Sequence, residues 1–286
     1  MKIINGKKLA EDLNDKLGQD IVLYKNKFKK NPSLVVILVG ENEASKVYVR
    51  NKEKKALEVG INSTVTKLSK DISENDLLQI IEKYNNDNSI DGILVQLPLP
   101  NHLDSDKVID KIAIEKDVDG FNSKNIGLLA LGRPKVIPCT PLGCFKMLEE
   151  TVNLEGKNVL ILGRSNIVGK PLSYLLTNNN ATITLAHSKT KNLKKICLAS
   201  DIIVAAIGRP KFLKKDFIKQ NAIILDVGIN VIKDDSGSRK IVGDVDFENV
   251  INKVAFISPV PGGVGPMTIH CLLLNTYLLA KLRNVL

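Results

Sequence analysis

Apolar residues recur every three to four positions in the first part of the chain. This spacing predicts a long amphipathic helix over residues 6–29. The positions that carry it are Leu9, Leu13, Leu17, Ile21 and Phe28. Short apolar runs follow, most of them ending near glycine or proline, and helical patterns lie between them. In this part of the chain we expect strands over 33–39, 62–68 and 90–97, and helices over 44–59 and 74–85 with Ser73 as an N-cap.

A second alternation of the same kind begins near Pro138. The predicted strands cover 157–162, 181–186, 201–207 and 222–227, and the predicted helices cover 142–151, 169–178 and 266–283. Alternating helices and strands are typical of parallel sheets covered by helices. We therefore expect an α/β protein of two domains, with the boundary near residues 120–140. The last helix is too apolar to stand alone, and we expect it to pack on the first domain.

Composition narrows the class of protein. Of the 286 residues, 44% are hydrophobic and 25% are charged, as in soluble globular domains, which excludes a disordered or collagen-like chain. The longest apolar stretch, 269–280, contains polar residues and is too short to cross a bilayer. The N-terminal residues show no secretory signal. The four cysteines have no metal-ligand spacing and fit reduced thiols of a cytoplasmic protein.

The net charge of +10 has three interpretations. It could form a nucleic-acid surface, it could be spread over solvated helix faces, or part of it could attract a phosphorylated or polycarboxylate ligand. The lysine runs are broken by acidic and apolar residues, which favours solvated faces. The chain has no Trp and only 4% aromatic residues, so it has few platforms on which bases could stack.

A strand, a glycine turn and a helix follow one another at residues 157–178. The turn runs from Gly163 to Gly169, which is the context of a dinucleotide site, although the glycine spacing is not GxGxxG and a plain strand-to-helix turn is the alternative. The next predicted strand ends at Ser188 and Lys189, with no acid to bind a ribose 2′-hydroxyl. Together with Arg164, these residues could face a 2′-phosphate, so the pattern favours NADP over NAD.

A second candidate site lies in the first domain. Tyr48 and Lys52 share one face of a predicted helix, and Gln96 ends a predicted strand. Asp119 follows in a turn-prone link between the domains. Such a group could transfer protons if the lysine loses its proton readily. The alternative is a solvated lysine, a tyrosine at the edge of the core, and turn or cap residues.

The sequence closely resembles the FolD family, bifunctional methylenetetrahydrofolate dehydrogenase and methenyltetrahydrofolate cyclohydrolase. Several motifs occur in family order over nearly the whole chain. They include Tyr48-Val-Arg-Asn-Lys52, Val95-Gln-Leu-Pro-Leu-Pro100, Lys116-Asp-Val-Asp-Gly-Phe121, Pro138-Cys-Thr-Pro-Leu-Gly143, Gly163-Arg-Ser-Asn-Ile-Val-Gly-Lys-Pro171, Asp226-Val-Gly-Ile-Asn230 and Pro259-Val-Pro-Gly-Gly-Val-Gly-Pro-Met-Thr268.

The resemblance implies the architecture. It implies a cleft between two α/β domains: a folate-binding catalytic domain of residues 1–137 plus 264–286, and a Rossmann-like, doubly wound NADP-binding domain of residues 138–263. It also implies a cytoplasmic homodimer formed through the cofactor domains, with no metal, nucleic acid or membrane partner.

The resemblance also implies roles for individual residues. Lys52 would be the general acid and base, Gln96 would tune its proton affinity, Tyr48 would position it, and Asp119 would bind the pterin. Gly163, Arg164, Ser165, Ser188 and Ile229 would bind NADP, and Pro261, Gly262 and Gly263 would line the cleft.

The implied reactions are oxidation of 5,10-methylenetetrahydrofolate and hydrolysis of the methenyl product to 10-formyltetrahydrofolate, as in one-carbon metabolism and purine biosynthesis. The alternatives are a dehydrogenase-only or NAD-dependent relative, and a non-catalytic binding protein.

Overall fold

The computed structural model describes residues 2–233 and 237–285. The chain forms two compact units, each built from two segments. The first, which we call the six-strand unit, comprises Met1–Glu11 and Thr140–Thr268, and the second, the three-strand unit, comprises Asp12–Cys139 and Ile269–Leu286. Two of the three boundaries fall inside the long helices α1 (Gly6–Phe28) and α10 (Val264–Val285), and the third lies between Cys139 and Thr140.

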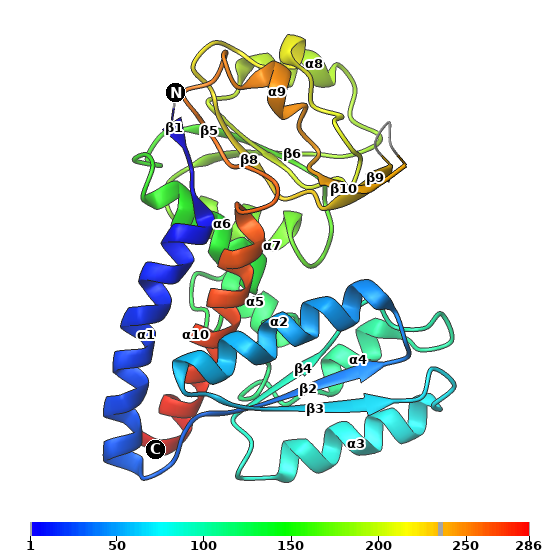
Figure 1. Ribbon diagram of the computed structural model, residues 1–286. Coiled ribbons are helices and arrows are strands. Elements are labelled where there is room, and N and C mark those ends of the chain that lie inside the picture. The colour runs from blue at the N-terminus through cyan, green and yellow to red at the C-terminus, as the bar shows by residue number, and fades with distance from the viewer. Residues whose placement is uncertain (1, 234–236, 286) are drawn as a thin grey trace. The chain divides into compact units, whose positions relative to one another are not determined.

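The three-strand unit contains a parallel sheet in the order β3-β2-β4. Its strands are β2 (Ser33–Val39), β3 (Asn62–Leu68) and β4 (Gly92–Val95). Helices α2 (Glu43–Val59) and α3 (Glu74–Asn86) lie on opposite sides of the sheet (Figure 1). Alternate residues of β2 pack with α3 and α4 (Ser105–Lys111) in one hydrophobic cluster, which fixes the sheet whose strand β4 leads into Gln96.

Local signals set the ends of these helices. Ser73 Oγ accepts a hydrogen bond from the backbone N–H of Asp76 at 3.1 Å, which confirms the predicted N-cap. At the start of α2, Asn42 Oδ1 accepts from the N–H of Ser45 at 3.0 Å. At its end Gly60 has φ +89°, the left-handed conformation that glycine adopts most readily.

The six-strand unit contains a parallel sheet in the order β1-β11-β8-β7-β5-β6. Its strands are β1 (Lys2–Ile3), β5 (Asn158–Leu162), β6 (Thr182–Ala186), β7 (Ile202–Ala205), β8 (Ile223–Asp226) and β11 (Phe256–Ile257). The chain leaves β5 for β6 on one side and then crosses to β7 on the other, so the strand order reverses at β5. This is the Rossmann-like, doubly wound arrangement, and it confirms the predicted fold class.

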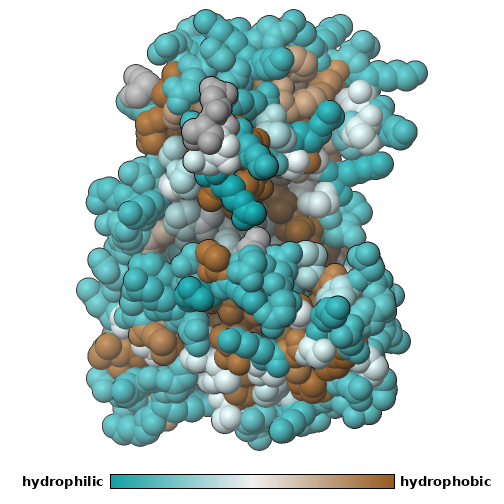
Figure 2. Space-filling view, turned by 45° about the vertical axis from the view of Figure 1, so that its right-hand side comes forward, coloured by the Kyte–Doolittle hydropathy of each residue, from teal (hydrophilic) through white to brown (hydrophobic). Residues whose placement is uncertain are grey.

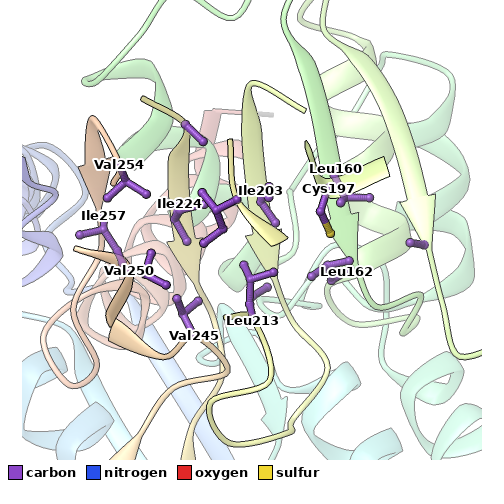
Figure 3. Close-up of a cluster of buried hydrophobic side chains, with 14 residues drawn as sticks. Leu160, Leu162, Cys197, Ile203, Leu213, Ile224, Val245, Val250, Val254 and Ile257 are labelled. Atoms are coloured by element: carbon purple, nitrogen blue, oxygen red, sulfur yellow. The ribbon is translucent and has the colours of Figure 1, made fainter. Parts of the chain in front are cut away.

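Helices α6 (Cys139–Glu149), α7 (Gly169–Thr177), α8 (Leu193–Ala199) and α9 (Phe247–Val250) and the short 3-10 helix η1 (Lys215–Phe217) complete the connections. Strands β9 (Asn230–Lys233) and β10 (Arg239–Val242) form a separate antiparallel pair. Figure 3 shows the hydrophobic cluster on one face of the large sheet, where Leu160, Ile203 and Ile224 from three neighbouring strands lie side by side. This buried layer holds β5, β7 and β8 together.

The two units divide the chain differently from the predicted domains near its ends. The sequence placed residues 1–137 together, but β1 pairs with β11, so residues 1–11 belong to the six-strand unit. The segment from Ile269 onward belongs to the three-strand unit, while residues 264–268 of the same helix belong to the six-strand unit. The predicted cleft between the domains stays a prediction.

The short elements were missed because they carry too few residues for a period to show. These are α4, α5 (Ser123–Ala130), α8, α9, β1, β9, β10 and β11.

The surface agrees with the composition. Figure 2 shows a face covered mainly by hydrophilic side chains, with hydrophobic residues in smaller groups. Within residues 2–233 and 237–285, no helix has the length and apolar character needed to cross a bilayer.

Candidate functional site

Lys52 lies almost entirely out of solvent, with 5% of its surface exposed. Its Nζ donates a hydrogen bond to Gln96 Oε1 at 3.0 Å. The same Nζ lies 4.9 Å from the centre of the Tyr48 ring. Three of the residues predicted from the sequence therefore meet in the three-strand unit. The alternative of a solvated Lys52 is excluded by its burial.

The elements of the fold explain this meeting. Tyr48 and Lys52 are one helical turn apart on α2, so they share a face. Gln96 follows β4, and its backbone N–H donates to the carbonyl of Ile37 at 2.9 Å. Gln96 Nε2 donates to the carbonyl of Leu97 at 2.7 Å, which turns Oε1 toward the lysine.

Burial and charge act in opposite directions on this group. Burial lowers the pKa of Lys52, while the charge of Asp119 and the nearby Cys139 thiol oppose that shift. Burial raises the pKa of Asp119, opposed by Lys52 and by a hydrogen bond with Cys139. A lysine with a lowered pKa can exchange a proton near neutral pH, which an exposed lysine does poorly.

The loop that carries Asp119 is held by a neighbouring carboxylate, Asp117, for which the sequence predicted no role. Asp117 Oδ1 accepts from the N–H of Gly120 at 3.0 Å, and Asp117 Oδ2 accepts from the N–H of Asn122 at 2.9 Å and from Asn125 Nδ2 at 2.8 Å. Burial raises the pKa of Asp117 to about 6. The two acids of the Asp-Val-Asp motif therefore have different roles. Asp117 accepts hydrogen bonds that hold the loop, whereas the charge of Asp119 raises the pKa of Lys52.

Helix α10 fixes the same loop from its other side. Asn275 Nδ2 donates to the carbonyls of Val118 and Ile137, each at 2.9 Å. Asn275 and Cys139 were also missed as contributors to the site. The signal for Asn275 was a polar residue inside a mostly apolar helix.

The six-strand unit contains a pocket of about 340 Å³ at the ends of β5, β6 and β7. Its lining combines apolar and cationic groups, namely Leu162, Gly163, Arg164, Ala186, His187, Ser188, Leu193, Ala206, Ile207, Arg209 and Phe212. The carboxyl ends of strands at a switch point are where open α/β sheets bind ligands. The structure therefore brings three of the predicted cofactor residues, Gly163, Arg164 and Ser188, to one pocket.

The two glycines of the turn are required by close backbone approach. Gly163 has φ +115°, and a Cβ there would lie 2.1 Å from the carbonyl oxygen of Ala206. A Cβ on Gly169 would lie 1.9 Å from the carbonyl oxygen of Gly163. The unusual spacing of the glycines thus closes a tight turn at the start of α7.

The other predicted cofactor residues do not line the pocket. Ser165 Oγ accepts from the N–H groups of Val168 at 3.1 Å and Gly169 at 3.4 Å, so it stabilises the turn before α7. Ile229, at 59% exposure, follows β8. Lys189 is exposed, and its N–H donates to His187 Nδ1 at 3.2 Å.

Two buried carboxylates hold the loops at the ends of β7 and β8. Asp244 accepts from the N–H groups of Ile207 at 2.7 Å, Gly208 at 3.0 Å and Arg209 at 2.8 Å. Asp226 in turn accepts from the N–H of Asp244 at 2.9 Å. The sequence did not predict this role of Asp226 and Asp244, because an acid after a strand can equally well bind a ligand or accept hydrogen bonds from its own loop.

The predicted loop of Pro261, Gly262 and Gly263 lies in the six-strand unit, away from the pocket lining. The carbonyl of Gly262 accepts from the N–H of Lys7 at 2.9 Å. A Cβ on Gly263 would lie 2.4 Å from the carbonyl oxygen of Pro259. The loop is therefore closely packed against the start of α1.

Comparison with known proteins identifies the family. Residues 4–119 match the tetrahydrofolate dehydrogenase/cyclohydrolase catalytic domain, and residues 138–284 match the NAD(P)-binding domain of the same family. A Wolbachia protein named "Bifunctional protein FolD" is 50% identical over 99% of this chain and 96% of its own.

Two solved structures extend the likeness. The bifunctional FolD enzyme of Campylobacter jejuni is 45% identical with a TM-score of 0.94 over 99% of both chains. FolD of Trypanosoma brucei, solved with NADP cofactor and an inhibitor, is 35% identical with a TM-score of 0.94 over 99% of this chain and 98% of its own. The chain belongs to the tetrahydrofolate dehydrogenase/cyclohydrolase family, as a bifunctional member of the FolD type.

Proposed function

We propose that the chain oxidises 5,10-methylenetetrahydrofolate with NADP and hydrolyses the resulting methenyl cation to 10-formyltetrahydrofolate. The observation that carries this proposal is the buried Lys52 bound to Gln96 and faced by Asp119, in a chain that contains both domains of its family. Bound NADP supplies the acceptor for the hydride that leaves the one-carbon bridge.

Lys52 acts in the hydrolytic reaction. As water attacks the methenyl carbon, the neutral amine takes one of its protons. The ammonium then returns that proton to N5 of the folate as the bond between this nitrogen and the carbon breaks. The remaining hydroxyl proton leaves to solvent, and a formyl group remains on N10. The lowered pKa of Lys52 supports this role because the neutral amine is available.

The neighbours of Lys52 have separate roles in this proposal. Gln96 Oε1 accepts a hydrogen bond from the amine, and the ring of Tyr48 packs against the amine on another side. Asp119 binds the amino-pyrimidine edge of the pterin, whose N–H groups suit a carboxylate acceptor. Pro261, Gly262 and Gly263 stay a predicted part of the folate-binding surface.

The pocket of the six-strand unit fits a phosphorylated nucleoside. Apolar residues can cover a planar base, and the guanidinium groups of Arg164 and Arg209 suit an anion. The pocket lining contains no carboxylate, which supports NADP, because an NAD site uses an acid to bind the ribose 2′-hydroxyl. Gly163, Arg164 and Ser188 would hold the adenosine part of the cofactor, Ser165 would shape the turn, and Ile229 would lie near the nicotinamide.

We further propose a homodimer formed through the six-strand units. Strand β6 ends the sheet formed by the described residues, and an unpaired edge can pair with another copy. The four cysteines are buried and are not joined in disulfides, which supports a cytoplasmic location. Sedimentation at several protein concentrations tests the dimer, and a single monomeric species at all of them would contradict it.

One assay separates the proposed function from its alternatives. The purified protein is mixed with 5,10-methylenetetrahydrofolate and either NADP or NAD, and absorbance is read before and after acidification. Acid converts 10-formyltetrahydrofolate back to the absorbing methenyl form. Reduction of NADP with methenyl absorbance mainly after acid is expected. Methenyl accumulating before acid would indicate a dehydrogenase alone, and preference for NAD would contradict the proposed cofactor. No reduction with either cofactor would support a binding protein.

A further inference from the structure

The nucleotide pocket contains a second arginine that no sequence motif marked. Arg209 follows β7 and lines the same pocket as Arg164, which follows β5, and Ser188, which follows β6. Strand β7 is the neighbour of β5 on the side opposite β6. Cationic and hydroxyl groups therefore come from three adjacent strand ends.

The backbone of Arg209 is fixed in place. Its N–H donates to Asp244 Oδ1 at 2.8 Å, and Asp244 is fully buried. The same carboxylate holds the two preceding residues, Ile207 and Gly208. Asn230 Nδ2 also donates to Asp244 Oδ1 at 2.9 Å, so the carboxylate itself is held. The backbone that carries Arg209 is therefore held in one position by hydrogen bonds to a buried carboxylate.

The side chain of Arg209 is oriented by an aromatic ring and forms no ion pair with a described carboxylate. Its guanidinium carbon lies 5.1 Å from the centre of the Phe212 ring, within the range of a cation–π contact. The ion pairs between residues in the described part of the chain involve neither Arg209 nor Arg164. Two guanidinium groups at one pocket without a carboxylate partner suit a dianion.

We infer that Arg209 is a second determinant of cofactor specificity, which binds the ribose 2′-phosphate of NADP together with Arg164. This inference rests on the proposed use of NADP and adds a residue to it. Arg209 forms a charge-assisted contact with the phosphate, and Phe212 holds its guanidinium at the pocket. NAD lacks the 2′-phosphate and gains nothing from this contact.

Binding of two nucleotide fragments tests the inference without the enzymatic reaction. Adenosine 2′,5′-bisphosphate carries the 2′-phosphate, and adenosine 5′-monophosphate lacks it. Their dissociation constants are measured by calorimetry for the unmodified protein, Arg209→Gln and Arg209→Lys. Arg239→Gln is the matched control, since Arg239 is an exposed arginine of β10 outside the pocket lining. Like Arg209→Gln, the Arg239→Gln substitution removes one positive charge from the six-strand unit.

The expected result is selective. Arg209→Gln weakens the bisphosphate roughly 10- to 100-fold, the range for a lost charged hydrogen bond, and leaves the monophosphate unchanged. Arg209→Lys falls between Gln and the unmodified protein, because it keeps the charge and loses the planar fork. Arg239→Gln leaves both constants unchanged.

Two results would overturn the inference while leaving NADP use intact. Equal weakening of both nucleotides would mean that Arg209 contacts a group that they share, the adenosine or the 5′-phosphate, and an unchanged bisphosphate constant would mean that it does not touch this part of the cofactor. An unmodified protein that binds both fragments equally would overturn the proposed cofactor itself, and this inference with it. A melting temperature for each variant excludes unfolding as the cause of lost binding.

Discussion

Gln96 Oε1 accepts the hydrogen bond of Lys52 Nζ at 3.0 Å while Gln96 Nε2 is held by the carbonyl of Leu97. The partner of the lysine is therefore a neutral group in a fixed orientation. A carboxylate in this place would attract the ammonium form and raise the pKa of Lys52. The amide positions the amine and leaves burial as the larger influence on its proton affinity.

Replacing Lys52 should separate the two proposed activities. Lys52→Met fills similar space without the amine, and we expect it to lower the cyclohydrolase rate roughly 100- to 10,000-fold, the range for a general acid or base. The dehydrogenase rate should fall less, because hydride transfer needs no proton from the lysine. Both rates are measured by absorbance. Lys54→Met is the control, since Lys54 is on the same helix with 75% side-chain exposure. Unchanged methenyl hydrolysis in a folded Lys52→Met protein would contradict the proposed role of Lys52 as general acid and base.

The pH dependence of hydrolysis should follow the proton on Lys52. Because burial lowers its pKa below 10.5, the rate should rise with pH through an inflection below that value. Gln96→Glu adds a negative charge at the amine and should move the inflection to higher pH. Rates are read from about pH 6 to 10. An inflection that stays in place in Gln96→Glu would show that another group controls the profile.

Arg164 should contribute to the choice between cofactors. Arg164→Ala removes a charged donor from the nucleotide pocket, and we expect NADP to bind roughly 10- to 100-fold more weakly with little change for NAD. Apparent affinities are obtained from dehydrogenase kinetics with each cofactor. Lys189→Ala provides the comparison, since Lys189 follows the neighbouring strand β6 but does not line the pocket. A preference for NADP that survives Arg164→Ala would remove this residue from the proposed phosphate site.

Two glycines should respond oppositely to alanine. A Cβ on Gly243 would lie 1.8 Å from Asp226 Oδ2, so Gly243→Ala should destabilise the protein by roughly 1–3 kcal/mol or more through displacement of the buried carboxylate. Gly18 lies within α1 with nothing within 4 Å of an added Cβ, so Gly18→Ala should stabilise it by up to about 1 kcal/mol. Denaturant unfolding measures both. Equal effects of the two substitutions would contradict the steric argument.

Asp226 should leave a signature in stability against pH. Burial raises its pKa from 3.8 to about 6 in the folded state. Between these values the folded state binds more protons than the unfolded state, so this group makes the free energy of unfolding fall as pH rises from about 4 to 6. Its contribution becomes constant only once the pH has passed well above the folded pKa of about 6.

The total fall from Asp226 is at most roughly 3 kcal/mol, from two pKa units. Asp226→Asn removes the titration, so its unfolding free energy should fall less over this range than that of the unmodified protein. Identical slopes in the two proteins would contradict the raised pKa. The slope is the informative quantity, since the substitution also disturbs the hydrogen bonds from Asp244 and Val245.

Periodicity predicted the long elements because each buries one continuous face. The strands of residues 33–39 and 62–68 have the same bounds in the structure, and the helix predicted over 6–29 ends one residue early. Periodicity cannot predict which distant segments pair with each other. Strand β1 has two residues and exists because β11 accepts it, some 250 positions later in the chain.

In the candidate site, too, contacts within one helix could be predicted from the sequence and contacts between distant segments could not. Tyr48 and Lys52 could be placed together from their helical spacing, whereas the contact with Gln96 depends on how β4 packs beside β2. Arg209 and Asp244 lie 35 positions apart and carry no helical or strand spacing that relates them. Their relation follows only from the loops that the large sheet brings to one end.

The pairing of β1 with β11 also limits how this chain can be divided. Each compact unit takes one segment from a terminus of the chain and another from its interior. A fragment starting at residue 138 would lack the strand that covers β11, and a fragment ending at 137 would lack the helical segment 269–286. No single cut yields two intact halves, so transplanting either unit into another protein requires grafting two separate stretches or rejoining them through a circular permutation.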